Sequence, residues 1–149
     1  MEYIEKCELT TLCLVYDEDK ILVQNRLKED WKGIVLPGGH VDKEESFVEA
    51  IIREIKEETN LDIYNPKLVG IKQFQEKGHR YITFLFKTNE FEGNLKSSDE
   101  GEVMWVKRSN LQDLDLVEDF IDLLSVFEDD DKQEFMYVEA GESFIKRIL

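Results

Sequence analysis

The chain has 149 residues, of which 42% are apolar and 36% charged, a composition typical of one globular domain rather than of a disordered segment. Its 34 acidic and 19 basic side chains give a formal net charge of −15, which disfavours binding along a nucleic acid polymer. A small phosphate compound could still bind if divalent cations lie between it and the carboxylates, although the acidity could equally serve solubility alone.

The first half of the chain predicts two strands and a helix. Strands are expected at 7–16 and 20–26, followed by a connecting loop at 27–35 and a chain-breaking Leu-Pro-Gly-Gly at 36–39. Ser46 is a suitable helix N-cap, and Glu49 three residues later completes a capping box. The helix should end at Thr59-Asn60. Its apolar stripe comprises Val48, Ile51, Ile52 and Ile55.

The second half predicts more strands and one further helix. Strands are expected at 67–76, 80–88 and 102–107, with a polar loop at 89–101, a helix at 116–127 and a tail strand at 134–138. Strands and helices mix without strict alternation, which favours an α+β fold or an α/β sandwich within one domain, 1–149.

The cysteines and the apolar segments bear on the compartment. Cys7 and Cys13 lie six residues apart on one expected strand, roughly 20 Å from each other, whereas a disulfide requires Cα atoms within about 7 Å. We therefore expect reduced thiols in a cytoplasmic protein. The first residues do not resemble a signal peptide, and no apolar run approaches the roughly 18 residues that span a membrane, so no membrane partner is expected.

Three carboxylates in the first helix form a pattern with chemical meaning. Glu54, Glu57 and Glu58 are spaced i, i+3 and i+4, so they share one helix face. Such a patch suits hard cations, which take oxygen ligands, but it could also be an acidic face in contact with solvent. The preceding Gly38-Gly39 allows close approach of the backbone to a ligand, or simply makes a tight turn.

The stretch from Gly39 to Leu61 resembles a known motif. It reads Gly39, five residues, Glu45, seven residues, then Arg-Glu-Ile-Lys-Glu-Glu-Thr-Asn-Leu, and covers 23 of the 149 residues. This resembles the Nudix box, G-x5-E-x7-R-E-U-x-E-E-x-G-U, where U is a bulky apolar residue. One position departs: Asn60 stands at the final glycine, where asparagine is the next best residue for a positive φ.

The resemblance to the Nudix hydrolases, and among them to MutT-like members, implies a fold and a reaction. The fold is an α/β/α sandwich with a mixed β-sheet between the box helix and a C-terminal helix. The reaction is Mg²⁺-dependent (or Mn²⁺-dependent) hydrolysis of a diphosphate bond, most often of a nucleoside triphosphate to monophosphate and pyrophosphate, sometimes of an oxidised one such as 8-oxo-dGTP. ADP-ribose and dinucleoside polyphosphates are alternative substrates. A non-catalytic nucleotide sensor is an alternative of another class, and a monomer or a homodimer remains open.

The resemblance also assigns roles to residues. The metal ligands would be Glu54, Glu57, Glu58 and the carbonyl group of Gly39. Glu45 would support Arg53 through a salt bridge, although Arg53 could instead be a simple i,i+4 partner of Glu49 and Glu57. The general base would be a box glutamate, Glu54 or Glu58, or a glutamate of a later loop, Glu100 or Glu102, of which Glu100 is preferred.

Substrate contacts are less defined by the resemblance. The candidates for substrate binding are Arg26, Leu36, Gly38 and Gly39. Trp31, Phe74 and Phe84 could line a base pocket or belong to the core. His40 and His79 have no identifiable partner, so neither receives a role.

Overall fold

The fold was obtained as a computed structural model that describes residues 2–27 and 32–149. Within these residues the chain forms β1 (Cys7–Asp17), β2 (Lys20–Arg26), β3 (Gly33–Val35), β4 (Gly38–His40), α1 (Phe47–Thr59), β5 (Asp62–Tyr64), β6 (Lys67–Glu76), β7 (His79–Thr88), β8 (Glu90–Glu92), β9 (Gly101–Lys107), a 3-10 helix (Arg108–Asp113), α2 (Phe120–Glu128), β10 (Glu134–Ala140) and β11 (Ser143–Ile148). No helix in this part of the chain is both long and apolar enough to span a membrane.

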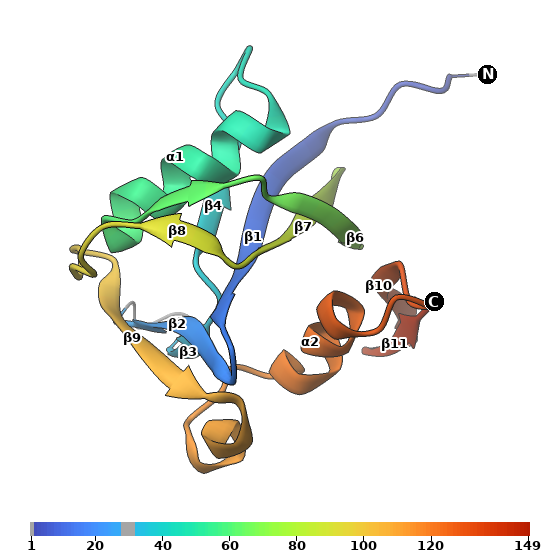
Figure 1. The fold of residues 1–149 in the computed structure, drawn as a ribbon. Coiled ribbons are helices and arrows are strands. Elements are labelled where there is room, and N and C mark those ends of the chain that lie inside the picture. Colours follow the sequence, from blue (N-terminus) through green and yellow to red (C-terminus); the bar gives the residue numbers. More distant parts are fainter. Residues whose placement is uncertain (1, 28–31) are drawn as a thin grey trace.

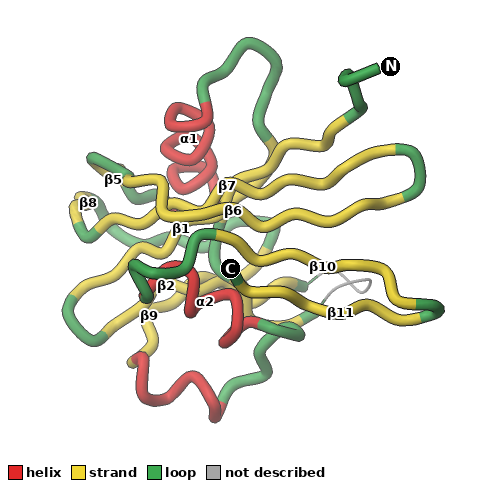
Figure 2. The backbone as a smooth tube through the Cα atoms, turned by 90° about the vertical axis from the view of Figure 1, so that its right-hand side faces the viewer, coloured by secondary structure: helices red, strands yellow, loops and turns green. Residues whose placement is uncertain are grey.

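The strands build one large mixed sheet. Its main path runs β11-β10-β6-β7-β1-β2-β3, with β4 added to β1 and β9 added to β2, while β5 and β8 form a separate pair. β1 pairs with β7 in parallel and with β2 and β4 in antiparallel orientation, so β1 connects the two halves of the sheet. Figure 1 shows α1 and α2 on different sides of the curled sheet, and Figure 2 shows the β10–β11 hairpin beside α2.

Two apolar clusters cover the two faces of the sheet. Successive strand residues point to opposite faces, so Cys13 of β1 joins Ile51 and Ile55 of α1, whereas Leu14 joins Leu124 of α2. Burial on both sides explains why β1 and β2 are apolar without alternation. The arrangement confirms the expected α+β sandwich with a mixed sheet between two helices.

The structure contains short strands that the sequence did not predict, and α2 starts later than expected. The expected loop at 27–35 contains β3, the Leu-Pro-Gly-Gly breaker leads into β4, and the polar loop at 89–101 begins with β8. A strand of three residues is too short to show an alternating pattern in the sequence. Its conformation is determined by pairing with a neighbouring strand instead. The second helix begins at Phe120 rather than at residue 116, because Asp119 adopts a left-handed conformation with φ 64° that a helix cannot include.

The first helix begins as expected. The Ser46 side chain accepts a hydrogen bond from the backbone N–H of Glu49 at 3.0 Å. Ile51 and Ile55 are fully buried, but Val48 is 46% exposed. Helical geometry points Val48 in nearly the same direction as Ile51 and Ile55, so its exposure shows that the first turn extends past the packed core. The expectation of an apolar stripe that includes Val48 is therefore wrong, and Ala50 is buried instead.

The end of α1 offers a stability test. Asn60 has φ 67°, its backbone N–H donates to the Lys56 carbonyl, and its side chain donates to the Asn94 carbonyl at 2.9 Å. Asn60→Ala should lower the free energy of unfolding by about 1–2 kcal/mol, because alanine is strained in the left-handed region. Asn60→Gly is the matched control, since it loses the same amide contact but tolerates the φ. Urea denaturation measures both variants. Equal stability of the two would show that the backbone conformation is not the cause.

Candidate active site

Two glycines bring the backbone of β4 against the carboxylates of α1. The backbone N–H of Gly38 donates to Glu58 Oε2 at 3.1 Å. A Cβ on Gly39 would lie 2.4 Å from the Glu54 carboxyl group, and a Cβ on Gly38 would lie 2.0 Å from the carbonyl oxygen of Thr11. No other residue type fits either position without displacing an atom of the site, so the Gly-Gly pair serves close approach rather than an ordinary turn.

Four glutamates gather at this place and form what we call the carboxylate cluster: Glu54, Glu57, Glu58 and Glu100. The Glu58 residue is only 3% exposed. Burial, together with the adjacent Glu100 carboxyl, raises the pKa of Glu58 to about 9, and burial also raises the pKa of Glu54. Buried like charges cost free energy unless cations accompany them. The donor set, all carboxylate and carbonyl oxygen, fits a hard divalent cation.

Arg53 holds part of this cluster in place. Its Nε and Nη2 donate to Glu45 at 2.7 and 3.0 Å, and its Nη1 donates to Glu54 at 3.0 Å and to Glu57 at 3.2 Å. Nη2 also donates to the backbone carbonyl of His40 at 3.0 Å. The hydrogen bonds from Arg53 keep the pKa of Glu45 below its usual value. The guanidinium therefore links the loop before α1, the helix and β4.

A cavity of about 270 Å³ adjoins the carboxylate cluster. The sequence candidates that line it are Arg26, Leu36, Gly38, Gly39, Glu54, Glu58 and Glu100. Glu102, the second loop candidate, is exposed on β9 and is absent from this lining. Trp31 lies outside the described residues.

The other two aromatic candidates for the base pocket lie elsewhere. The Phe84 ring stacks on Phe47, with 4.0 Å between centroids, and belongs to the core on the α1 side. Phe74 stacks on Tyr81, with 5.0 Å between centroids. Neither ring belongs to the cavity lining, so of the two readings the structure favours a packing role for both.

Several residues that line the cavity were not among the candidates from the sequence. Gln24, Lys72 and Asp119 come from β2, β6 and the residue before α2, and only the fold brings them together. The Gln24 side-chain nitrogen is buried without a hydrogen-bond partner. Burial lowers the pKa of Lys72. The Asp119 carboxylate accepts hydrogen bonds from Tyr137 and from Lys146 of the C-terminal hairpin. Of these three residues, only Lys72 stood out in the sequence, because a lysine directly after the apolar residues of β6 is unusual.

The raised pKa of Glu58 predicts a pH effect on stability. Glu58 binds its proton more tightly in the folded than in the unfolded chain, where the ordinary value is 4.5. The stabilisation is therefore complete below about pH 4.5 and is lost as the pH rises toward about 9. In chelator-treated protein the Tm should fall from pH 6 to 9, and excess Mg²⁺ should reduce the fall. Thermal melts measure it, and Glu58→Gln should flatten the chelated curve. If Tm fell equally with pH in Glu58→Gln and in the wild type, Glu58 would not be the cause of the pH effect.

Comparisons with known proteins match most of the chain. The family model described as NUDIX domain matches residues 8–129. The uncharacterized Nudix hydrolase YvcI of Bacillus subtilis is 32% identical over 120 residues, which cover 76% of this chain and 73% of that protein. An ADP-ribose pyrophosphatase of Methanocaldococcus jannaschii is 34% identical over 92 residues, which cover 60% of this chain and 54% of that protein.

A solved structure matches over nearly the whole length. The crystal structure of a mutator MutT protein from Bacillus halodurans superimposes with a TM-score of 0.77 at 28% identity. The match covers 95% of this chain and 97% of that one. The whole carboxylate cluster therefore lies within the residues that the family model matches.

Proposed function

The chain belongs to the NUDIX domain family, whose members are pyrophosphohydrolases, and on this basis we propose that it hydrolyses a nucleoside triphosphate to monophosphate and pyrophosphate with Mg²⁺. The observation that carries the proposal is the carboxylate cluster, in which Glu58 is buried and Glu54, Glu58 and Glu100 line the cavity. Nudix enzymes act on small nucleotide substrates, and the cavity of about 270 Å³ beside the carboxylates can receive part of such a molecule. An oxidised nucleotide, such as 8-oxo-dGTP, is part of the same proposal.

Nudix hydrolases generally use a divalent metal ion, and the residues here fit one. The proposed ligands are Glu54, Glu57, Glu58 and the carbonyl oxygen of Gly39. That carbonyl accepts a hydrogen bond from the Thr11 side-chain hydroxyl at 3.0 Å, which helps to orient it. When bound, Mg²⁺ or Mn²⁺ neutralises phosphate charge and acidifies a coordinated water.

The remaining steps fall to side chains of the chain itself. Glu100 is the proposed general base, because its carboxyl lies against Glu58 at the cavity wall and can take the proton of an attacking water. Arg53 orients Glu54 through the 3.0 Å hydrogen bond. Arg26 lines the same cavity, and its positive charge can offset the charge of a bound phosphate.

The apolar part of the cavity lining supports a nucleobase as the other end of the substrate. Leu36, Phe120 and Phe135 supply apolar lining suited to a planar ring. The unpaired Gln24 amide nitrogen can donate a hydrogen bond to the substrate. Lys72 and Asp119 add a donor and an acceptor within the same lining. These groups could discriminate among bases by the pattern of donors and acceptors that each base presents.

ADP-ribose is the second candidate substrate, supported by the activity that the name of the Methanocaldococcus jannaschii relative states. Dinucleoside polyphosphates share the diphosphate but need room for a second nucleoside. A non-catalytic sensor is less favoured, because every carboxylate of the motif is present and Arg53 donates to three of them, Glu45, Glu54 and Glu57. We further propose that residues 1–149 act as one domain, in the cytoplasm, on small molecules rather than polymers, as a monomer or homodimer.

A release assay tests the proposal. Purified full chain with Mg²⁺ or Mn²⁺ is offered standard and oxidised deoxynucleoside triphosphates, ADP-ribose and diadenosine polyphosphates. Phosphate, pyrophosphate and the nucleotide products are all measured, because ADP-ribose and diadenosine polyphosphates yield nucleotides or sugar phosphates rather than pyrophosphate. Pyrophosphate release from a triphosphate is the expected result, and turnover of ADP-ribose alone would replace the proposed substrate. No turnover, together with a ligand-dependent rise in Tm, would overturn hydrolysis in favour of the sensor.

A further inference from the structure

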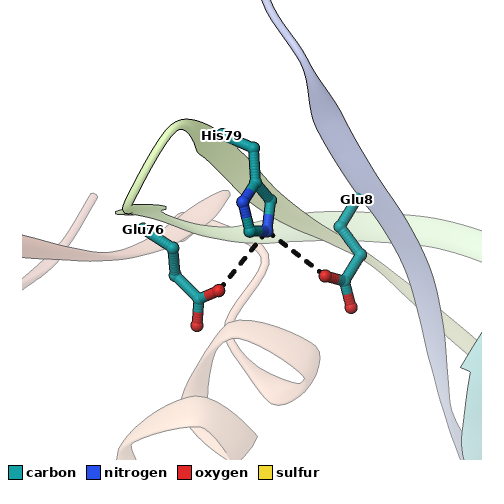
Figure 3. A group of neighbouring side chains, drawn as sticks. All are labelled: Glu8, Glu76 and His79. Carbon is teal, nitrogen blue, oxygen red and sulfur yellow. Dashed lines mark hydrogen bonds and ion pairs between the residues drawn. The ribbon is translucent and has the colours of Figure 1, made fainter.

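A second group of ligand-type side chains lies on the sheet at the turn between β6 and β7. Glu8 comes from β1, Glu76 is the last residue of β6, and His79 is the first residue of β7 (Figure 3). Glu76 and His79 are opposite each other in the hairpin, and Glu8 pairs with Tyr81 in the parallel ladder. One ligand atom from each side chain lies within 4.8 Å of the others. The backbone of three paired strands therefore holds the group together.

The distances from His79 in this group suit a shared metal ion as well as an ion pair. His79 Nε2 lies 3.2 Å from Glu8 Oε1 and 3.3 Å from Glu76 Oε2. Charge-assisted N–H···O bonds are shorter, about 2.7–2.9 Å. A nitrogen of imidazole also carries at most one hydrogen, which cannot point at both carboxylates. Two ligands bound tetrahedrally at about 2.0–2.1 Å from one ion are about 3.3 Å apart, as both pairs are here.

We propose that Glu8, Glu76 and His79 bind a divalent transition-metal ion of the zinc class. One imidazole and two carboxylates suit Zn²⁺, which binds three protein ligands plus water, whereas Mg²⁺ takes oxygen ligands and is poorly matched by imidazole. The site thus differs in chemistry from the all-oxygen carboxylate cluster of α1. The two glutamates bring two negative charges to one imidazole, so a divalent ion balances the group.

A neighbouring histidine supports the proposed ligand geometry. His40 Nε2 lies 2.6 Å from Glu8 Oε2, whereas His79 contacts the other carboxylate oxygen, Oε1. A hydrogen bond on one oxygen orients a ligating carboxylate and leaves the other oxygen for the ion. The side chains of Glu8, Glu76 and His79 are 35%, 49% and 28% exposed, so an ion can enter from solvent.

The test is a Zn²⁺ titration of the full chain followed by nitrogen NMR of its two histidines. A Glu57→Gln/Glu58→Gln background weakens binding at α1, so the titration reports the second site. We expect His79 Nε2 to take the shift of a deprotonated, metal-bound nitrogen at one equivalent of Zn²⁺. His79→Asn should abolish this equivalent, and Glu76→Gln should weaken it by about tenfold or more. Glu142→Gln, an equal charge change at an exposed turn, should leave it intact.

Two outcomes would overturn the proposal. If His79 only titrates with pH and does not respond to Zn²⁺, the group is an ion-pair network. If Zn²⁺ affinity is unchanged in Glu76→Gln or in His79→Asn, the bound ion lies elsewhere. Because Glu76 is half exposed, its variant should fold even where the histidine variant does not. The readout is binding, so failure of the proposed hydrolysis would not alter it.

Discussion

Glu57→Gln and Glu58→Gln variants should each turn over substrate about a hundredfold or more slowly than the wild type. Each change removes one negative oxygen from the proposed metal ligands while retaining shape, and metal-assisted charge neutralisation contributes several kcal/mol to such reactions. The fold should persist. Glu57 has a side chain 59% exposed, and a glutamine oxygen at position 58 can still accept the hydrogen bond from Gly38.

The measurement is steady-state pyrophosphate release at saturating Mg²⁺, with Tm recorded for every variant. Glu49→Gln is the matched control, because it makes the same charge change in the first turn of α1 and glutamine still suits a capping box. Wild-type turnover in either the Glu57 or the Glu58 variant, with Glu49→Gln also normal, would refute the metal assignment. A fall in turnover for Glu49→Gln as well would indicate a general effect of helix charge.

The helical part of the site was predictable because its residues are close in sequence. The spacing of Glu54, Glu57 and Glu58 alone fixes a shared helix face, and Ser46 and Asn60 mark the two ends of that helix. Local rules of this kind depend on a few neighbouring residues, so they hold before the fold is known. The resemblance added the partner of Arg53, and the structure places Glu45 within hydrogen-bond distance of it.

The rest of the cavity depended on contacts that no local rule encodes. Lys72 and Asp119 lie 47 positions apart, and they reach one cavity because β6 and α2 pack together across the sheet. The same applies to His79, which had no identifiable partner until β1 and β7 paired in parallel and placed Glu8 beside it. Phe74 and Phe84 show the converse, since their aromatic character was visible but the direction of each ring was not.

Gly39→Ala should weaken Mg²⁺ binding by about 10–100-fold and lower turnover at limiting Mg²⁺ by a similar factor. The added Cβ would lie 2.4 Å from the Glu54 carboxyl, so that side chain has to move from its position in the site. Gly39 is not among the glycines with positive φ, so alanine does not strain the backbone there. The change should therefore act on the carboxylate and lower Tm only slightly.

A double-mutant cycle with Glu54→Gln separates this cause from a general disturbance of β4. If Gly39→Ala acts by displacing Glu54, adding it to Glu54→Gln should produce little further loss of Mg²⁺ affinity. Additive losses would mean that alanine harms the site by another path, such as a shift of the Gly39 carbonyl itself. Mg²⁺ titrations of activity and of Tm in the two single variants and the double variant decide between these causes. Near-complete non-additivity would establish that Gly39 serves the site by leaving room for the Glu54 carboxylate.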